Sequence, residues 1–339
     1  MDDDRMPAGP GRRGVLAVAS AAAAALAVPA AAQPGDAGGT VWAGEYTARK
    51  GGVGLYVYRK RLGPPVAGAA ALPVLFLVHG SSMSSRPTFD LVVPGAGEYS
   101  IMDVFARAGF DVWTMDHEGY GRSDRTAGNS DIASGVADLQ AAAAVVERET
   151  GATRFHLVGE SSGALRAAAF AIAEPARAGR LVLEAFTYTG RGSPTLEKRA
   201  EQVDLYRAHN RRPRDAAMLR SIFTRDRPGT SDMRVADALA AAELPYGDSV
   251  PSGTYLDMVA HLPVVDPARI LSPVLVARGQ YDGIATEADL LDFYTRLPNP
   301  DRQFVILPGA AHAVTLGLNR ALLWHAMLGF LTAPAVVQT

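Results

Sequence analysis

The clearest candidate for a reactive group in this sequence is a serine that lies between two glycines. Ser161 is the central residue of G-E-S-S-G at positions 159–163, between an apolar run and an alanine-rich one. On a tight turn from a strand into a helix, a serine projects its hydroxyl above the sheet, and the two glycines let the backbone turn and the helix pack closely. The pattern therefore predicts a nucleophile for attack on a carbonyl carbon.

A serine hydroxyl is a weak nucleophile at neutral pH, so it needs a base nearby and an acid that holds the base in the correct tautomer. His312 in P-G-A-A-H-A-V and Asp282 in R-G-Q-Y-D-G-I-A each follow an apolar run that we expect to form a strand. Both then lie at the carboxyl edge of a parallel sheet, where open α/β sheets place their functional groups. We predict a catalytic triad of Ser161, Asp282 and His312, with Glu184 as the alternative acid.

Acyl transfer also requires hydrogen-bond donors aimed at the oxygen that becomes negative when the carbonyl turns tetrahedral. We expect one donor to be the backbone amide of Ser162, the residue after the nucleophile. The other is expected from the H-G-S-S loop that begins at His79, where we favour the amide of Ser81 and keep Ser82 as the alternative. His79 itself is expected to shape this loop and not to act as a base.

These loops must be held by a sheet, and the pattern of apolar residues predicts one. From residue 73 onward, short apolar runs alternate with helical stretches, which is typical of a parallel sheet covered on both faces. Strands are expected at 40–49 and 53–59, as an antiparallel start, and at 74–78, 111–115, 155–158, 181–186, 274–277 and 304–307. Helices are expected at 101–108, 131–149, 164–174, 287–297 and 319–331. Gly109, Gly151 and Gly179 are expected to end the first three helices.

The alternation lapses between residues 190 and 262, where the chain is rich in arginine and mostly helical. We therefore predict a helical lid at 190–262, inserted between the sixth and seventh strands of a core that comprises residues 33–189 and 263–339. Such a lid covers an active site and sets substrate choice. More than half of the candidates to line its apolar pocket are expected to be core residues; the candidates are Tyr188, Tyr206, Phe223, Tyr246, Tyr255, Met258 and Leu262.

Four side chains are proposed as substrate contacts from their positions near the nucleophile or in the lid. They are Glu160, Tyr188, Tyr255 and Met258. Glu160 comes directly before Ser161, and pairing with a nearby arginine is the alternative role for it. Positive charge gathers in the run 209–214 and at Arg225 and Arg227, which indicates either a solvated helical face or recognition of a substrate carboxylate.

Together these motifs resemble the α/β-hydrolase family, and the resemblance extends over essentially all residues from about Thr40 onward. The segments that carry it are L-F-L-V-H-G at 75–80, D-H-E-G-Y-G-R-S at 116–123, G-E-S-S-G at 159–163, R-G-Q-Y-D-G at 278–283 and G-A-A-H at 309–312. The resemblance implies an α/β-hydrolase fold and hydrolysis of esters or related bonds without a cofactor or a metal. The chain order of serine, acid and histidine is also that of the family.

The leading hypothesis is a carboxylesterase-like serine hydrolase that cleaves the ester of a small or medium organic molecule through an acyl-enzyme on Ser161. A hydrolase that cleaves an amide or a carbon–carbon bond with the same triad is the first alternative. The second alternative, from another class, is a periplasmic binding protein that kept the fold and lost catalysis. The triad alone does not separate the two enzymes, because it activates the same nucleophile for each.

Composition excludes several other classes of protein. The chain has 339 residues, of which 48% are hydrophobic, and this is enough apolar material for a large core. Lys and Arg total 33 against 35 Asp and Glu, a net charge of -2, so no overall positive field attracts nucleic acid or an anionic membrane. The chain contains no cysteine, which excludes disulfides, a cysteine nucleophile and thiolate metal sites.

The first 32 residues are typical of an export signal. The pair Arg12-Arg13 precedes a small apolar run at 15–28, and Ala30-Ala31-Ala32 offers a cleavage site. Two arginines ahead of apolar residues are similar to the twin-arginine signal of bacterial proteins that are exported already folded. We expect a periplasmic or secreted protein without stable membrane insertion of the mature chain, and a retained membrane anchor is the alternative.

Overall fold

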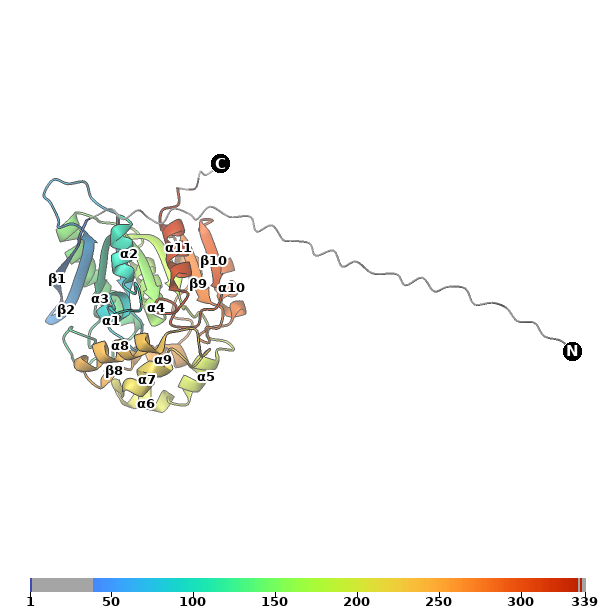
Figure 1. The fold of residues 1–339 in the computed structure, drawn as a ribbon. Coiled ribbons are helices and arrows are strands. Elements are labelled where there is room, and N and C mark those ends of the chain that lie inside the picture. Colours follow the sequence, from blue (N-terminus) through green and yellow to red (C-terminus); the bar gives the residue numbers. More distant parts are fainter. Residues whose placement is uncertain (2–38, 335, 337–339) are drawn as a thin grey trace. The chain divides into compact units, whose positions relative to one another are not determined.

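An eight-stranded sheet forms the centre of this computed structural model, which describes residues 39–334 together with Met1 and Val336 (Figure 1). The strands lie in the order β1-β2-β4-β3-β5-β6-β9-β10. The β1–β2 and β2–β4 pairs are antiparallel and all other neighbouring pairs are parallel, which confirms the predicted α/β-hydrolase fold. The strands are β1 (Val41–Lys50), β2 (Val53–Leu62), β3 (Val74–Val78), β4 (Asp111–Met115), β5 (Phe155–Glu160), β6 (Ala178–Glu184), β9 (Val274–Gly279) and β10 (Arg302–Leu307).

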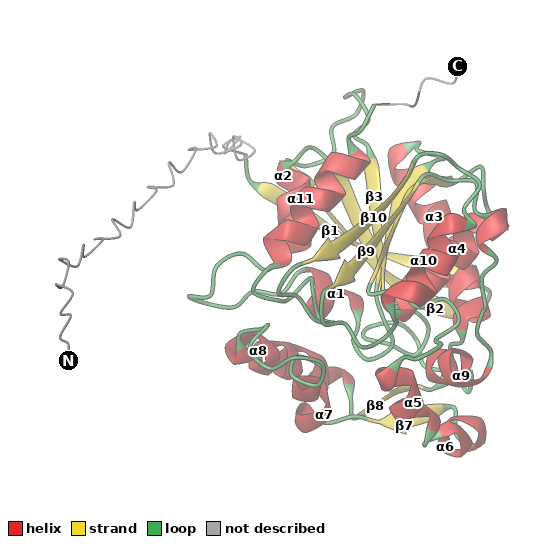
Figure 2. Cartoon of the chain, turned by 90° about the vertical axis from the view of Figure 1, so that its right-hand side faces the viewer, coloured by secondary structure: helices red, strands yellow, loops and turns green. Residues whose placement is uncertain are grey.

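Two apolar cores, one on each face of the sheet, follow from the alternation of side chains along each strand. In β3, for example, Phe76 points into one core and Leu75 into the other. The helices α3 (Ile132–Thr150), α4 (Ser162–Ala173) and α10 (Glu287–Thr295) cover the first face, and α2 (Ile101–Arg107) and α11 (Arg320–Leu331) cover the second (Figure 2). Within the described residues, every helix is too short or too polar to cross a membrane.

Of the three glycines that were predicted to end helices, two lie at or just beyond a helix end and the third does not. Gly151 has left-handed backbone angles directly after α3, and Gly109 has a positive φ just beyond α2. The prediction for Gly179 is wrong, because α4 ends at Ala173 and Gly179 lies inside β6. A Cβ at this position would come within 2.8 Å of the Nδ1 atom of His156, so the glycine allows β6 to pack closely on β5. The short helix α1 (Ser85–Phe89) was also not predicted.

Residues 190–262, which we call the insertion, connect β6 to β9 and lie beyond one end of the sheet in both views (Figures 1 and 2). Most of the insertion is helical, and a two-stranded antiparallel ribbon of β7 and β8 crosses it. Its elements are α5 (Pro194–Ala200), α6 (Val203–Ala208), β7 (Arg211–Pro213), α7 (Ala216–Ser221), α8 (Met233–Glu243), the 3-10 turn η1 (Leu244–Tyr246), β8 (Ser249–Pro251) and α9 (Gly253–Ala260). The role of the insertion as a lid stays a prediction, as does the export signal at 1–32, which lies outside the described residues.

A buried ion pair fastens the insertion to the loop that follows β3. Arg214 donates hydrogen bonds to the carboxylate of Glu243 at 2.6 Å and to the carbonyl oxygen of Ser82 at 3.0 Å. The other carboxylate oxygen of Glu243 accepts hydrogen bonds from the amide and the hydroxyl of Ser84. Removing one member of such a pair leaves a buried charge without compensation, so the contact is costly to break. The loop after β3 therefore depends on the insertion for its position.

Candidate active site

Ser161 occupies a strained turn between β5 and α4. Its φ angle is +56°, a value that non-glycine residues rarely adopt. Such a conformation costs about 1–3 kcal/mol and persists only where the surrounding structure imposes it. Its amide donates a hydrogen bond to the carbonyl oxygen of Glu184 at 2.9 Å. The flanking glycines permit this turn, since a Cβ on Gly163 would overlap the carbonyl oxygen of Val78, and one on Gly159 would overlap the backbone of α4. The G-x-S-x-G pattern thus reflects the close approach of β3, β5 and α4.

His312 and Asp282 form a buried hydrogen-bonded pair beside this turn. Asp282 follows β9, His312 follows β10, and the Nδ1 atom of His312 lies 2.9 Å from Oδ1 of Asp282. Burial alone would raise the pKa of Asp282, but the His312 ring and the amide of Ile284 outweigh it and lower the pKa below its usual value. An ionised Asp282 holds the Nδ1–H tautomer of the imidazole, and Nε2 is then free to accept a proton.

The nucleophile and the histidine line one small pocket. Ser161 and His312 lie in its wall together with Glu160, Ser81 and Ser82. Within the described part of the chain, no hydrogen bond joins the Ser161 hydroxyl to His312. Catalytic hydrogen bonds are commonly loose before a substrate binds and tighten in the complex. The structure therefore brings the three predicted triad residues to one site, with the acid–histidine contact already formed.

The alternative acid, Glu184, is placed differently. It lies on β6 directly opposite Glu160 on β5, and both of its carboxylate oxygens are buried without a hydrogen-bond partner. Burial raises the pKa of Glu184 well above its usual value, and the neighbouring carboxyl groups of Glu160 and Asp282 raise it further. A raised pKa favours the neutral form of the glutamate, and a neutral carboxyl group is not suited to stabilise an imidazolium ring. The geometry therefore pairs His312 with Asp282 and not with Glu184.

Glu160 is also a buried acid with a perturbed pKa. One of its carboxylate oxygens has no hydrogen-bond partner, and the side chain faces the pocket that contains Ser161. Burial, reinforced by the charge of Asp282, raises the pKa of Glu160 to about 7. Glu160 therefore does not pair with an arginine, which was the alternative role that its sequence position suggested; within the described residues it forms no ion pair.

We expect the unfolding free energy of the wild-type protein to fall more steeply between about pH 5 and about pH 8 than that of a Glu160→Gln variant. Folded Glu160 keeps its proton up to about pH 7, whereas the unfolded chain releases it near the ordinary value of 4.5. The stability from this proton is present below the lower value and lost as the pH rises through the upper one. Glutamine is neutral throughout, so the variant lacks this loss of about 3 kcal/mol.

Urea unfolding at the two pH values measures the effect, because it gives the free energy of both proteins under matched conditions. The control is Glu197→Gln, which changes an exposed glutamate on α5 and should keep the wild-type dependence. The prediction requires the difference in unfolding free energy between the wild type and Glu160→Gln to change between the two pH values. Equal slopes for the wild type and Glu160→Gln would contradict it.

Two of the predicted oxyanion donors, Ser81 and Ser82, line the same pocket, and the third, Ser162, directly follows Ser161. Ser162 is the first residue of α4, so its amide has no acceptor within the helix. The hydroxyl of Ser81 donates to that of Ser162 at 2.6 Å and accepts a hydrogen bond from Thr254 of the insertion at 2.8 Å. In the described part of the chain, the backbone amides of Ser81 and Ser82 donate no hydrogen bond. Both remain available, and the choice between them stays a prediction.

His79 is buried and has no free ring nitrogen. Its Nδ1–H lies 2.8 Å from the carbonyl oxygen of Gly80, and its Nε2 accepts a hydrogen bond from the amide of His117 at 3.1 Å. Burial lowers its pKa well below the ordinary histidine value, so the ring stays neutral. These contacts fit a residue that shapes the loop after β3, as the sequence indicated.

The predicted aromatic and apolar contacts are mostly parts of the packed interior. Tyr188 packs on Phe293, with ring centroids 5.5 Å apart, and Met258 is buried in the same core. Tyr255 is fully buried, and its hydroxyl lies 2.6 Å from that of Ser82. None of the three predicted side chains is among the described residues that line the pocket around Ser161.

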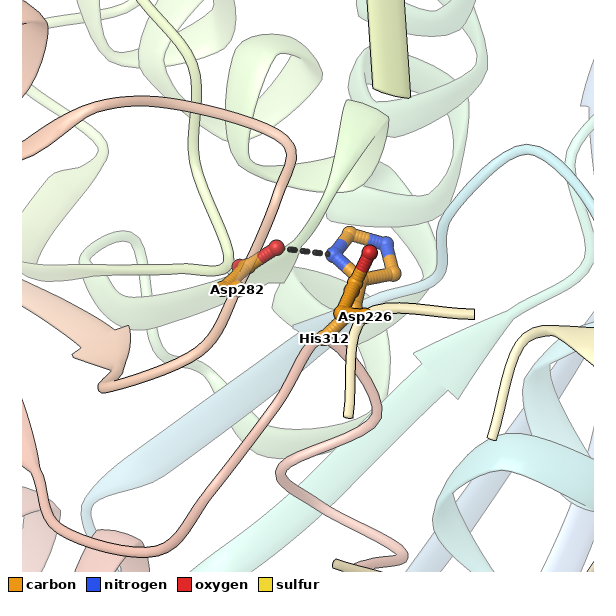
Figure 3. Close-up of side chains that lie close together, drawn as sticks. All are labelled: Asp226, Asp282 and His312. Carbon is orange, nitrogen blue, oxygen red and sulfur yellow. Dashed lines mark hydrogen bonds and ion pairs between the residues drawn. The ribbon is translucent and has the colours of Figure 1, made fainter. Parts of the chain in front are cut away.

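Asp226 reaches the site although its position in the sequence did not indicate it. It lies between α7 and α8 of the insertion, its side chain is only 6% exposed, and its carboxylate reaches toward the His312 ring (Figure 3). One ligand atom from each of Asp226, Asp282 and His312 lies within 4.8 Å of the others, so this group has the donors for a metal ion. An ion bound through Nδ1 of His312 would replace the Asp282–His312 hydrogen bond on which a serine triad depends.

Known proteins resemble this chain in sequence and in fold. Residues 91–318 match the family described as serine aminopeptidase, S33. A 2-hydroxy-6-oxononadienedioate/2-hydroxy-6-oxononatrienedioate hydrolase from Paraburkholderia phymatum is 35% identical over 125 residues, which is 34% of this chain and 36% of that protein. The match therefore spans only about a third of the curated relative.

Two solved structures share the fold at low sequence identity. A carboxylesterase from Bacillus subtilis has a TM-score of 0.62 and 17% identity, with 87% of this chain and 93% of that chain covered. A 2-hydroxy-6-oxo-6-phenylhexa-2,4-dienoate hydrolase from Rhodococcus also has a TM-score of 0.62, with 18% identity and coverage of 86% and 98%. Similarity at this level of identity shows the fold and does not identify the substrate.

Proposed function

Because this chain belongs to the serine aminopeptidase S33 family of α/β hydrolases, we propose that it is a serine hydrolase whose target is a carboxylic ester. The observation that carries the proposal is the buried Asp282–His312 pair, whose histidine lines one pocket with the strained Ser161. A histidine held in this way can take the proton of the serine hydroxyl, and this activates the alcohol toward a carbonyl carbon. An ester is the least demanding substrate for such a site, because an alkoxide leaves a tetrahedral intermediate more readily than an amide nitrogen does.

The proposed reaction proceeds through an acyl-enzyme. Ser161 Oγ attacks the carbonyl carbon while its proton moves to Nε2 of His312, and Asp282 stabilises the imidazolium through Nδ1. The carbonyl oxygen becomes negative and accepts hydrogen bonds from the amides of Ser162 and of Ser81 or Ser82. When the C–O bond breaks, His312 returns the proton to the departing alcohol. A water molecule, deprotonated by the same histidine, then releases the acid and restores Ser161.

Hydrolysis of a carbon–carbon bond is the second candidate, and the sequence relative favours it. The name of the Paraburkholderia protein describes a substrate with a ketone and two carboxylates and with no ester. Hydrolysis of such a molecule must break a carbon–carbon bond next to the ketone. The same triad can serve this reaction, so the two candidates differ in substrate and not in the residues that carry the nucleophile and the base.

A substrate panel combined with covalent labelling tests the proposal. We expect a fluorophosphonate to modify Ser161 and the protein to hydrolyse short 4-nitrophenyl esters faster than 4-nitroanilides or vinylogous diketones. Turnover of the diketones without turnover of any ester would favour the second candidate. An adduct on another serine would contradict the assignment of the nucleophile. A protein that neither reacts with the probe nor turns over any of these compounds would favour the non-catalytic binding protein.

A further inference from the structure

A basic pocket adjoins the one that contains Ser161. It has a volume of about 210 Å³, and its charged lining residues are Lys198, Arg199, Arg212 and Arg225 of the insertion. No aspartate or glutamate is among the described residues that line it. Ser82, Arg199 and Arg225 line both pockets, so the basic pocket borders the space in front of the nucleophile.

Two of these four cations have no anionic partner within the described residues. Lys198 pairs with Glu201, and Arg225 lies 3.3 Å from Asp226. Arg199 and Arg212 form no ion pair with any described carboxylate, and the Nε atom of Arg212 is buried without a hydrogen-bond partner. Among the described residues, the one side-chain hydrogen bond that these two guanidinium groups donate runs from Arg199 to the sulfur of Met258 at 4.0 Å, so most of their donors are not used inside the protein.

The two arginines without an ion pair both lie over one aromatic ring, that of Tyr255. The guanidinium of Arg199 lies 5.1 Å from the centre of the Tyr255 ring, and that of Arg212 lies 4.7 Å from it. The hydroxyl of Tyr255 lies 2.6 Å from that of Ser82, in the loop expected to hold the oxyanion. A group bound between the two arginines is thus held at a fixed position relative to the reacting carbonyl.

The electrostatics of the pocket favour an anion. Burial, together with repulsion from Arg225, lowers the pKa of Arg199 to about 10, so the side chain is still charged at neutral pH. A partly buried cation without a counter-ion destabilises the structure, and an anion that enters the pocket offsets this loss. A planar guanidinium binds a carboxylate through two parallel hydrogen bonds, which makes a carboxylate the best matched anion.

We propose that the basic pocket binds a free carboxylate of the substrate, so that the enzyme selects esters that carry their own acid group, such as half-esters of short dicarboxylic acids. This inference rests on the proposed function, because it places the acid group next to an ester bond at Ser161. It assigns Arg199 and Arg212 as specificity-determining residues. Arg225 contributes positive charge at the border between the two pockets.

Monomethyl glutarate and methyl pentanoate form a matched pair of esters that differ in the acid group. We expect the wild type to prefer monomethyl glutarate in kcat/KM, and Arg199→Gln or Arg212→Gln to reduce this preference roughly tenfold to a hundredfold, mainly through KM. Added salt should also weaken the preference of the wild type. The control is Arg207→Gln, which changes an exposed arginine on α6 and should keep the wild-type preference.

Binding of glutarate to the Ser161→Ala protein, measured by calorimetry, tests the pocket without turnover. We expect saturable binding that a second substitution, Arg199→Gln, weakens at least about tenfold. If neither methyl ester is hydrolysed but glutarate binds in this arginine-dependent way, the proposed esterase activity fails and the carboxylate pocket stands. Equal kcat/KM for the two esters, absence of saturable glutarate binding, or binding that Arg199→Gln leaves unchanged would each overturn the carboxylate pocket.

Discussion

A Ser161→Ala variant should fold like the wild type and lose roughly 10⁴-fold to 10⁶-fold in kcat on any ester that the wild type hydrolyses. The substitution removes only the hydroxyl group. The strained turn is held by the backbone hydrogen bond from residue 161 to Glu184, which the variant keeps. Initial rates with a 4-nitrophenyl ester measure the loss, and circular dichroism with a thermal melt verifies the fold. The residual activity should match what the oxyanion donors alone contribute.

Non-additivity gives the sharper form of this test. When two residues act as one catalytic unit, removing either of them already removes almost all of the rate enhancement that they provide. The double variant Ser161→Ala/His312→Ala should therefore be hardly slower than Ser161→Ala alone. Ser134→Ala, on α3, provides the matched control and should keep wild-type rates. Losses in the two single variants that multiply in the double variant would show that Ser161 and His312 act separately, against the proposed mechanism.

The second large effect is expected at the acid. Asp282→Asn should lower kcat roughly 10³-fold to 10⁴-fold, because an amide at this place no longer selects the Nδ1–H tautomer or stabilises the imidazolium. Glu184→Gln, the substitution of the same kind at the alternative acid, should cost less than about tenfold, since Glu184 forms no hydrogen bond to His312. Rates of both variants at several pH values measure the difference.

The opposite pattern of losses in these two variants would contradict the assignment of Asp282 as the acid. A large loss of kcat in Glu184→Gln combined with a small loss in Asp282→Asn would assign the role of the acid to Glu184 on β6. Both variants should keep the fold, because each replaces a carboxyl with an amide of nearly the same size. A melting temperature close to that of the wild type verifies this for each protein.

The positions of the triad residues could be predicted because each follows a short apolar strand. Alternation of apolar runs with helical stretches gives a parallel sheet, and the carboxyl ends of its strands then meet at one edge. The end of α4 was predicted to within one residue, and only the role given to Gly179 was wrong. Pro175 disfavours helical angles at Glu174, and this signal is stronger than the glycine four residues further on.

Other features of the site depend on contacts between segments that are far apart in the sequence. Glu160 and Glu184 face each other because of the register between β5 and β6, which the pattern of either strand alone does not determine. Asp226 and Arg199 reach the site because the insertion folds over it, and their surroundings in the sequence are ordinary charged helices and turns. Side chains of this kind become recognisable only when the packing of the insertion is known.

The Arg214–Glu243 pair limits how this architecture can be recombined. A chimera that replaces residues 190–262 with the corresponding segment of another hydrolase removes both charges, and the Ser84 amide and the Ser82 carbonyl lose their partners. The grafted enzyme would then turn over slowly even those compounds that its new segment admits. Substrate range and catalytic power are inherited jointly in this protein, so directed evolution should vary single pocket residues and leave the segment whole.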